Sequence, residues 1–275
     1  MKRSRRSKLA THLILGAWAL VVLFPLWTML SNSLKPKRDI FRNPYGIPDT
    51  ITFDGYIRAW TDGDFALYFR NSLFVTITAI LLVMFIGSLA AYALAHWRSR
   101  TSTLLYLGFV AGMMVPIRLG TINLIQIVKQ LGLIDTMYGL IPIYVAMSLP
   151  IGIFVLTAFI RGLPHELNEA GRVDGASEWQ MYYKITLPLI RPALATVAIF
   201  SLIPIWNDIW FPLILISNDS HNTVMLGVTA LFGQYQTDWN RILSALSLSA
   251  LPILVLYLFM SKQFIRGLTS GAVKG

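Results

Sequence analysis

Six apolar segments divide the chain, and polar or charged stretches separate them. Each apolar segment holds close to the roughly 20 residues that an α-helix needs to cross a ~30 Å hydrocarbon core. The segments are residues 13–30, 73–95, 103–125, 137–160, 192–216 and 242–260. The pattern therefore predicts an all-α integral membrane protein with about six transmembrane helices.

Proline and composition refine this picture. The chain is 55% hydrophobic and only 13% charged, whereas an ordinary soluble domain has roughly 25% charged residues. Prolines recur inside the apolar segments, and each removes a backbone donor, so we expect kinked helices that surround a protein interior or an aqueous path. These prolines are Pro25, Pro116, Pro142, Pro150, Pro204, Pro212 and Pro252.

The charge pattern predicts the orientation of the segments. The net charge of +10 is spread over short loops, which does not favour nucleic-acid binding. Four basic stretches fall on one side if the segments alternate, so that side and both termini are expected to be cytoplasmic. We divide the chain into a basic N-terminus at residues 1–12, a transmembrane domain at 13–262 and a C-terminal tail at 263–275. Segment 13–30 is longer than the apolar part of a signal peptide and is expected to be a retained anchor.

Two further polar stretches are expected outside the membrane. The loop 31–70 mixes acidic and basic residues and falls on the external side in this topology. Residues 119–136 alternate polar and apolar positions at helical spacing, with Gly132 placed to end the helix. We expect a short helix in the external interface there.

The polar stretch after the fourth apolar segment predicts two helices joined by a bend. Pro164 favours a helix start, and residues 174–175 are an Asp-Gly turn pair. Ser177 and Gln180 have the spacing of a capping box, which predicts a second helix that continues until the Leu-Pro pair at 187–188. A connection of about thirty residues with its own capping signals is longer than most loops.

This bent segment resembles the cytoplasmic signature of permease subunits of bacterial ATP-binding-cassette importers. The signature reads E-A-A, three residues, G, nine residues, I-x-L-P, and Gly171 replaces its second alanine here. In that family the segment docks into a cleft on a separate ATPase subunit and transmits its closure. The resemblance implies an importer permease fold with a coupling loop at 161–191. The implied ATPase-coupling residues are Glu169, Ala170, Gly171, Asp174, Gly175, Ala176, Ile185, Leu187 and Pro188.

Other stretches narrow the resemblance to carbohydrate-importer permeases of the maltose type. They are "NSLFVTITAILLVMFIGSLAAYALA" from Asn71, "LGLIDT" from Leu131, "WNDIWFPLIL" from Trp206 and "GLTSGAVKG" from Gly267. This similarity implies a multi-pass subunit of a bacterial plasma (inner) membrane importer for a sugar or oligosaccharide. Its implied partners are a second, different permease chain, two ATPase subunits that use ATP and Mg²⁺, and an extracytoplasmic solute-binding protein that faces the external loop. In relatives the C-terminal tail can lie against the ATPase pair.

The residues give no sign of catalysis by this chain. It has no G-x-x-x-x-G-K-[ST] phosphate loop, no H-E-x-x-H and no G-x-S-x-G. Cysteine is absent, and the four histidines lack ligand spacing. We therefore expect no catalytic residue, no metal and no cofactor bound by the chain itself, and membrane lipid as its surroundings. A self-sufficient secondary transporter, an integral membrane enzyme and a permease for a non-sugar solute are the alternatives.

Polar and aromatic residues in the fifth apolar segment are candidates for contact with substrate. Trp206, Asn207, Asp208 and Trp210 could border the translocation path, since aromatic faces and hydrogen-bonding groups suit a sugar. Asp208 could equally cap a helix break near one of the prolines or pair with a polar group of a neighbouring span. Arg118 is expected to extend to the interface.

Overall fold

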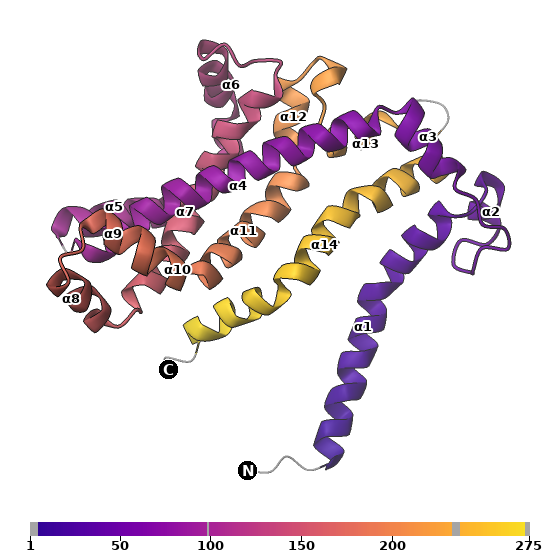
Figure 1. The fold of residues 1–275 in the computed structure, drawn as a ribbon. Helices are drawn as coiled ribbons and strands as arrows, with labels where there is room; N and C mark the ends of the chain where they lie inside the picture. Colours follow the sequence, from indigo (N-terminus) through magenta and orange to yellow (C-terminus); the bar gives the residue numbers. More distant parts are fainter. Residues whose placement is uncertain (1–4, 98, 233–236, 273–275) are drawn as a thin grey trace. The chain divides into compact units, whose positions relative to one another are not determined.

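The computed structural model describes residues 5–97, 99–232 and 237–272. Within this part of the chain all regular structure is helical (Figure 1). The elements are α1 (Arg5–Ser33), α2 (Lys37–Arg42), α3 (Asp54–Asp62), α4 (Phe65–His96), α5 (Arg100–Gly112), η1 (Ile117–Gly120), α6 (Thr121–Gln130), η2 (Met137–Gly139), α7 (Leu140–Arg161), α8 (His165–Val173), α9 (Glu178–Gln180), η3 (Met181–Thr186), α10 (Leu187–Leu189), α11 (Arg191–Trp206), α12 (Trp210–Leu215), η4 (Asp219–His221), α13 (Val224–Ala230) and α14 (Trp239–Ala272).

Four straight helices in the described residues are long and apolar enough to cross a membrane. They are Thr11–Ser33, Phe65–His96, Met137–Arg161 and Trp239–Phe259. Two bent helix pairs raise the number to six if each pair is one span. The all-α membrane fold expected from the sequence is confirmed.

Two of the expected spans are not continuous helices. The segment 103–125 breaks after α5, and the pieces Arg100–Gly112 and Ile117–Gln130 meet at 88°. Pro116 stands in this break and has no N–H to extend the ladder of α5. The segment 192–216 is interrupted between α11 and α12, where Asp208 captures the free N–H groups that begin α12. The helix expected within residues 119–136 is present as α6, and Gly132 follows it with a φ of +69°, while its external position stays a prediction.

By its internal contacts the chain divides into two compact units. The first comprises Met1–Leu67 with Gly227–Leu251, and the second comprises Tyr68–Leu226 with Pro252–Gly275. Each unit is described by itself below.

Polar contacts fix the first unit around the start of α14. Asn240 is buried there and donates to the backbone oxygens of Ser33 at 3.1 Å and Lys35 at 2.8 Å. Asp238 pairs with Lys37 at 2.7 Å and with Arg58 of α3. Burial alone would raise the pKa of the Asp238 carboxyl, but hydrogen bonds from Lys37, the Arg241 backbone N–H and Arg58 outweigh it and hold the pKa below its usual value. The polar loop 31–70 is therefore a folded element.

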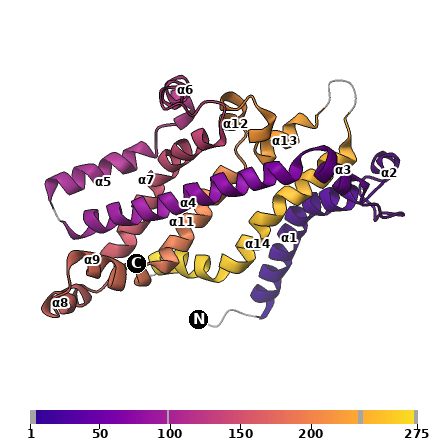
Figure 2. The ribbon, with the colours of Figure 1, turned by 45° about the horizontal axis from the view of Figure 1, so that its top comes forward.

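The core of the second unit forms where α7 packs between α4 and α11. Apolar side chains at helical spacing on the three helices are buried against one another, which is the usual way in which such stripes associate. The central members are Val75, Val83, Leu140, Ile143, Leu156, Ala193 and Val197. Figures 1 and 2 show α8 and α9 near the end of α4 at one end of this unit, and α6 with α12 at the opposite end. The polar region at α8 and α9 and the polar region at α6 and α12 therefore lie at opposite ends of this unit.

Candidate coupling segment and translocation path

The segment after α7 folds into the bent pair of helices that its sequence predicts. Pro164 precedes α8, and Glu166 lies in the first turn, where a negative charge complements the helix dipole. The helix ends at Asp174, and Gly175 follows with a φ of +74°, a conformation that favours glycine. Asp174 and Gly175 therefore form the bend.

The second helix begins with a capping box and then widens. Ser177 Oγ accepts from the Gln180 N–H, and the Gln180 side chain accepts from the Ser177 N–H at 2.9 Å. After α9 the turns take π-helical form over Met181–Thr186, and α10 follows directly. The expected stop at the Leu-Pro pair is wrong, because Pro188 lies in the first turn of α10, where a missing N–H is tolerated. The chain instead turns by 72° before α11.

Gly171 explains the departure from the E-A-A pattern. It is the buried residue of α8. A Cβ at this position would lie 2.4 Å from Met181 Sδ and 3.0 Å from Ile185 Cδ1, both in η3. The sequence predicts only a small loss of helix stability at Gly171. The structure adds a positive role, since glycine lets the second helix approach the first.

Side chains on one face of α4 attach the bent segment to the transmembrane core. Tyr92 donates to Glu178 Oε2 at 2.8 Å. The Ser88 and Tyr182 hydroxyls lie 2.7 Å apart. His96 Nε2 lies 3.2 Å from Asn168 Oδ1.

None of these contacts is expected from the sequence alone. Ser88, Tyr92 and His96 recur every four residues, which places them on one helix face, and this spacing is the signal that could have found them. Arg172 adds a bond to Glu178 Oε1 at 3.1 Å. The bent segment is therefore attached to α4 at three positions.

Several side chains of the segment stay exposed. Glu169 is exposed and makes no ion pair within the described residues. Large apolar side chains also face outward, with exposed fractions of 86% for Val173 and 57% for Trp179. Of the other expected coupling residues, one group is exposed and the other partly buried. The exposed ones are Ala170, Asp174, Gly175 and Pro188, and the partly buried ones are Ala176, Ile185 and Leu187.

Asp208 lies at the opposite end of the unit, in the break between α11 and α12. Its Oδ2 accepts from the Phe211 N–H and from the Tyr144 hydroxyl, each at 3.0 Å. Its Oδ1 accepts from the Trp210 N–H at 3.3 Å and lies 3.8 Å from Arg118 Nη2. Asp208 is 8% exposed and Tyr144 is 1% exposed. The carboxylate therefore caps α12 and joins it to α7.

The remaining candidates for the path differ in their access to solvent. Trp206 is 2% exposed and packs in the core, whereas Asn207 is exposed. Trp210 is 41% exposed, and its Nε1 donates to Thr121 Oγ1 at 3.1 Å. The Arg118 guanidinium lies 5.8 Å from the Trp210 ring centroid, within the range of a cation–π contact. Arg118 thus bends towards Trp210 and Asp208.

Asp135, in the stretch "LGLIDT", ties the segment before α7 to the end of α12. Its carboxylate accepts from the N–H groups of Ser217 at 2.7 Å and Asn218 at 2.8 Å. Its own N–H donates to Leu215 O at 2.8 Å, and it adopts a φ of +58°. The hydrogen bonds from Asn218 and Ser217 lower the pKa of the Asp135 carboxyl. The sequence marks this stretch, but the partner loop 82 positions away follows only from the fold.

The described residues contain no group of three or more His, Asp or Glu side chains that could hold a metal ion. The expected absence of a metal and of a catalytic constellation stays a prediction. The C-terminal residues 273–275 lie outside the described part of the chain, and so does Arg98.

Comparison with known proteins identifies the family. Residues 83–270, more than half of the chain, match the family described as "Binding-protein-dependent transport system inner membrane component". The chain belongs to this family. As an inner membrane component it is a transport permease. This family membership favours the permease interpretation over the two alternatives, a self-sufficient transporter and a membrane enzyme.

Curated relatives of this inner membrane component are themselves permeases. It is 32% identical over 272 residues to the diacetylchitobiose uptake system permease protein NgcG of Streptomyces coelicolor, which covers 98% of this chain and 90% of the relative. It is 31% identical over 277 residues to the melibiose/raffinose/stachyose import permease protein MelC of Bacillus subtilis, with full coverage of both chains. The arabinooligosaccharides transport system permease protein AraQ of Halalkalibacterium halodurans is 31% identical, also with full coverage.

A solved structure shares the fold of this permease. A chain of a bacterial ABC transporter involved in the import of the acidic polysaccharide alginate superposes with a TM-score of 0.80 at 21% identity. The match covers 96% of this permease and 99% of that chain. The expected importer permease fold is confirmed.

Proposed function

We propose that this permease forms half of the translocation path of an ATP-driven importer for a sugar or oligosaccharide, and that residues 164–188 couple it to separate ATPase subunits. The ATPase subunits would bind ATP and Mg²⁺ and carry out the hydrolysis. A second permease chain would complete the path, because six kinked helices enclose little space alone. A solute-binding protein would deliver the sugar from outside.

The observation that carries the proposal is a bent segment that is attached to α4 and still keeps charged and apolar side chains exposed. Glu178 attaches it to α4 through Tyr92. Glu169 and the apolar Val173 and Trp179 stay exposed. Exposed apolar side chains beside a charge are typical of a protein–protein contact. A segment that is attached to the core and also offers such side chains is suited to transmit a partner's movement.

The proposed orientation follows from the basic residues near this segment. Arg161, Arg172, Lys184 and Arg191 are all within or beside it, and such residues accumulate on the cytoplasmic side. The bent segment would then face the cytoplasm, where ATP is available, and α6 and α12 would lie towards the external side. Both termini would be cytoplasmic in the inner membrane.

A carbohydrate is the substrate class that the path residues favour. Trp210 offers a partly exposed aromatic ring, and Asn207 is exposed as well. The carbohydrate names of the relatives add independent support. In this proposal Asp208 and Trp206 shape the path from behind, since both are buried.

ATPase activity of the assembled importer in lipid tests the proposal, with and without sugar-loaded binding protein. We expect loaded binding protein to stimulate hydrolysis in the wild type. Glu169→Ala should reduce that stimulation by roughly tenfold or more, because a charged contact at a buried interface is lost. Gly175→Pro should abolish it, since proline cannot adopt a φ of +74°. Glu166→Ala on the same helix is the matched control and should keep the stimulation. Normal stimulation in both variants would refute the coupling role.

A further inference from the structure

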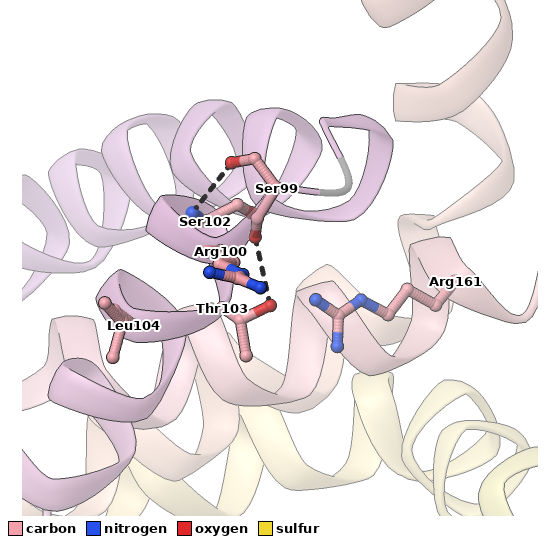
Figure 3. Close-up of a pocket in the computed structure, with 6 residues that line it drawn as sticks. All are labelled: Ser99, Arg100, Ser102, Thr103, Leu104 and Arg161. Atoms are coloured by element: carbon pink, nitrogen blue, oxygen red, sulfur yellow. Dashed lines mark hydrogen bonds between the residues drawn. The ribbon is translucent and has the colours of Figure 1, made fainter.

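A hollow lies where the start of α5 meets the end of α7. Its volume is about 720 Å³, and Figure 3 shows the six side chains that line it. They are Ser99, Arg100, Ser102, Thr103, Leu104 and Arg161. The hollow lies outside the bent segment 164–188, and it does not include the residues around Asp208.

Two guanidinium groups from different helices share this hollow. In Figure 3 the Arg161 side chain extends towards Arg100 and Thr103. Among the described residues that line the hollow, none carries a carboxylate. Neither arginine forms an ion pair within the described part of the chain. Like charges that face each other without a counter-charge repel, and an anion between them would remove that repulsion.

The two arginines are held differently. The Arg161 guanidinium donates to Leu94 O at 3.2 Å and lies 4.9 Å from the Tyr106 ring centroid. These contacts fix its position and leave further N–H donors, because a guanidinium carries five. Arg100 is exposed and makes no side-chain hydrogen bond with the described residues. Arg161 is thus held in place and Arg100 is free to adjust, so both guanidinium groups can bind the same anion.

Hydroxyl groups complete the polar lining. Ser99 Oγ accepts from the Ser102 N–H at 3.1 Å and keeps its own proton as a donor. Thr103 Oγ1 donates to Ser99 O at 3.1 Å and keeps acceptor capacity. Guanidinium and hydroxyl donors together suit the oxygens of a phosphate, which arginine binds through parallel N–H groups.

Exposed apolar side chains continue along α5 beyond the hollow, and a lipid has hydrocarbon chains to cover them, whereas a soluble anion does not. Along α5 the exposed fractions are 68% for Leu104, 55% for Leu105 and 53% for Leu107. Trp97, just before α5, is 68% exposed, and tryptophan is enriched at membrane interfaces. A molecule with a phosphate in the hollow would place hydrocarbon chains along these leucines.

We propose that this hollow binds the headgroup of an anionic phospholipid of the leaflet in which it lies, with Arg100 and Arg161 as its phosphate ligands. Basic pockets between transmembrane helices on the cytoplasmic side are known to hold such headgroups. The proposal rests on the membrane placement given under Proposed function, but not on the sugar or on the coupling role. The bound lipid would brace α5 against α7 beside the coupling segment.

Native mass spectrometry of the assembled importer tests this proposal. The complex is equilibrated with equal amounts of phosphatidylglycerol and phosphatidylcholine, and the lipids retained after detergent exchange are counted. We expect preferential retention of phosphatidylglycerol. Each arginine near a charged headgroup contributes roughly a fivefold preference. Arg100→Gln should therefore reduce the preference about fivefold, and Arg100→Gln with Arg161→Gln about thirtyfold.

The controls separate this site from general electrostatics and from misfolding. Lys184→Gln with Arg191→Gln removes the same charge from the same end of the unit and should keep the preference. Arg100→Gln alone guards against misfolding, because the Arg100 side chain is exposed and makes no hydrogen bond or ion pair with the described residues.

Three results would overturn the proposal. One is a preference that is equal in the Arg100 and Lys184 variants. Another is displacement of the lipid signal by millimolar inorganic phosphate, which would indicate a soluble-anion site. The third is loss of a partner subunit from the Arg100 variants without change in lipid retention, which would indicate a protein contact. ATPase stimulation, measured separately, reports on the coupling role and not on this site.

Discussion

Replacement of Asp208 distinguishes a structural role from direct contact with substrate. In Asp208→Ala the N-terminal N–H groups of α12 lose their acceptor, which costs about 0.5–2 kcal/mol for a helix cap. The buried Tyr144 hydroxyl loses its acceptor as well, at about 1–3 kcal/mol. The two losses together amount to about 1.5–5 kcal/mol. Asp208→Asn keeps one oxygen for the cap and should lose less than half of this.

The assay compares stability with transport in the same variants. Thermal unfolding of the purified complex should show a midpoint several degrees lower for Asp208→Ala. Tyr144→Phe should give a smaller shift, because it removes a single hydrogen bond and leaves no buried group without a partner. Asn207→Ala, at the exposed neighbouring position, is the control and should unfold as the wild type does.

Transport kinetics in proteoliposomes complete the comparison. If Asp208 acts by positioning α12, the loss of transport across the Asp208 and Tyr144 variants should follow the loss of stability. An Asp208→Ala complex that unfolds normally but no longer transports sugar would refute this reasoning and would assign the carboxylate to substrate contact. Normal stability together with normal transport would remove Asp208 from both roles.

Three further predictions concern other parts of the chain. Gly175→Ala should strain the bend by about 1–2 kcal/mol and weaken ATPase stimulation, whereas Gly175→Asn should be milder, because asparagine tolerates a positive φ. Gly171→Ala should push the Met181 side chain aside and speed hydrogen exchange across residues 165–190, and adding Met181→Ala should restore protection if the clash is the cause. Because the pKa of Asp238 is lowered in the folded state, its contribution to stability is present above the unfolded value and is lost as the pH falls through the lowered folded value. Asp238→Asn should therefore flatten the acid side of a stability profile, and an unchanged profile would contradict the ion pair with Arg58.

The bent coupling segment is the part of the molecule that local sequence signals specify best. An Asp-Gly pair and a capping box act over three or four residues, and both appear in the structure at Gly175 and Ser177. The breaks within the apolar segments are harder to predict from the sequence, since hydrophobicity alone cannot distinguish a straight span from two helices that meet at 88°. Pro116 indicates where the helix can break, but it does not predict the angle between the two pieces.

Contacts between residues that are distant in the sequence are even harder to predict. Tyr92 and Glu178 are 86 positions apart, and nothing local to either residue predicts their hydrogen bond. Arg100 and Arg161 share a hollow only because α5 packs on α7. Gly171 shows the difference between local and tertiary information. Its helix propensity predicts a small loss of helix stability, whereas the structure shows that glycine leaves room for the Met181 side chain.

The most direct test of the coupling account uses the absence of cysteine from the chain. A single cysteine at Val173, which is 86% exposed on the coupling segment, is compared with one at Leu119, which is 81% exposed at the opposite end of the same unit. The account predicts that Val173→Cys cross-links to an ATPase subunit in the assembled importer, that nucleotide changes the yield, and that Leu119→Cys gives no such product. Absence of the Val173→Cys cross-link in a complex that still hydrolyses ATP, or an equal yield from Leu119→Cys, would contradict it.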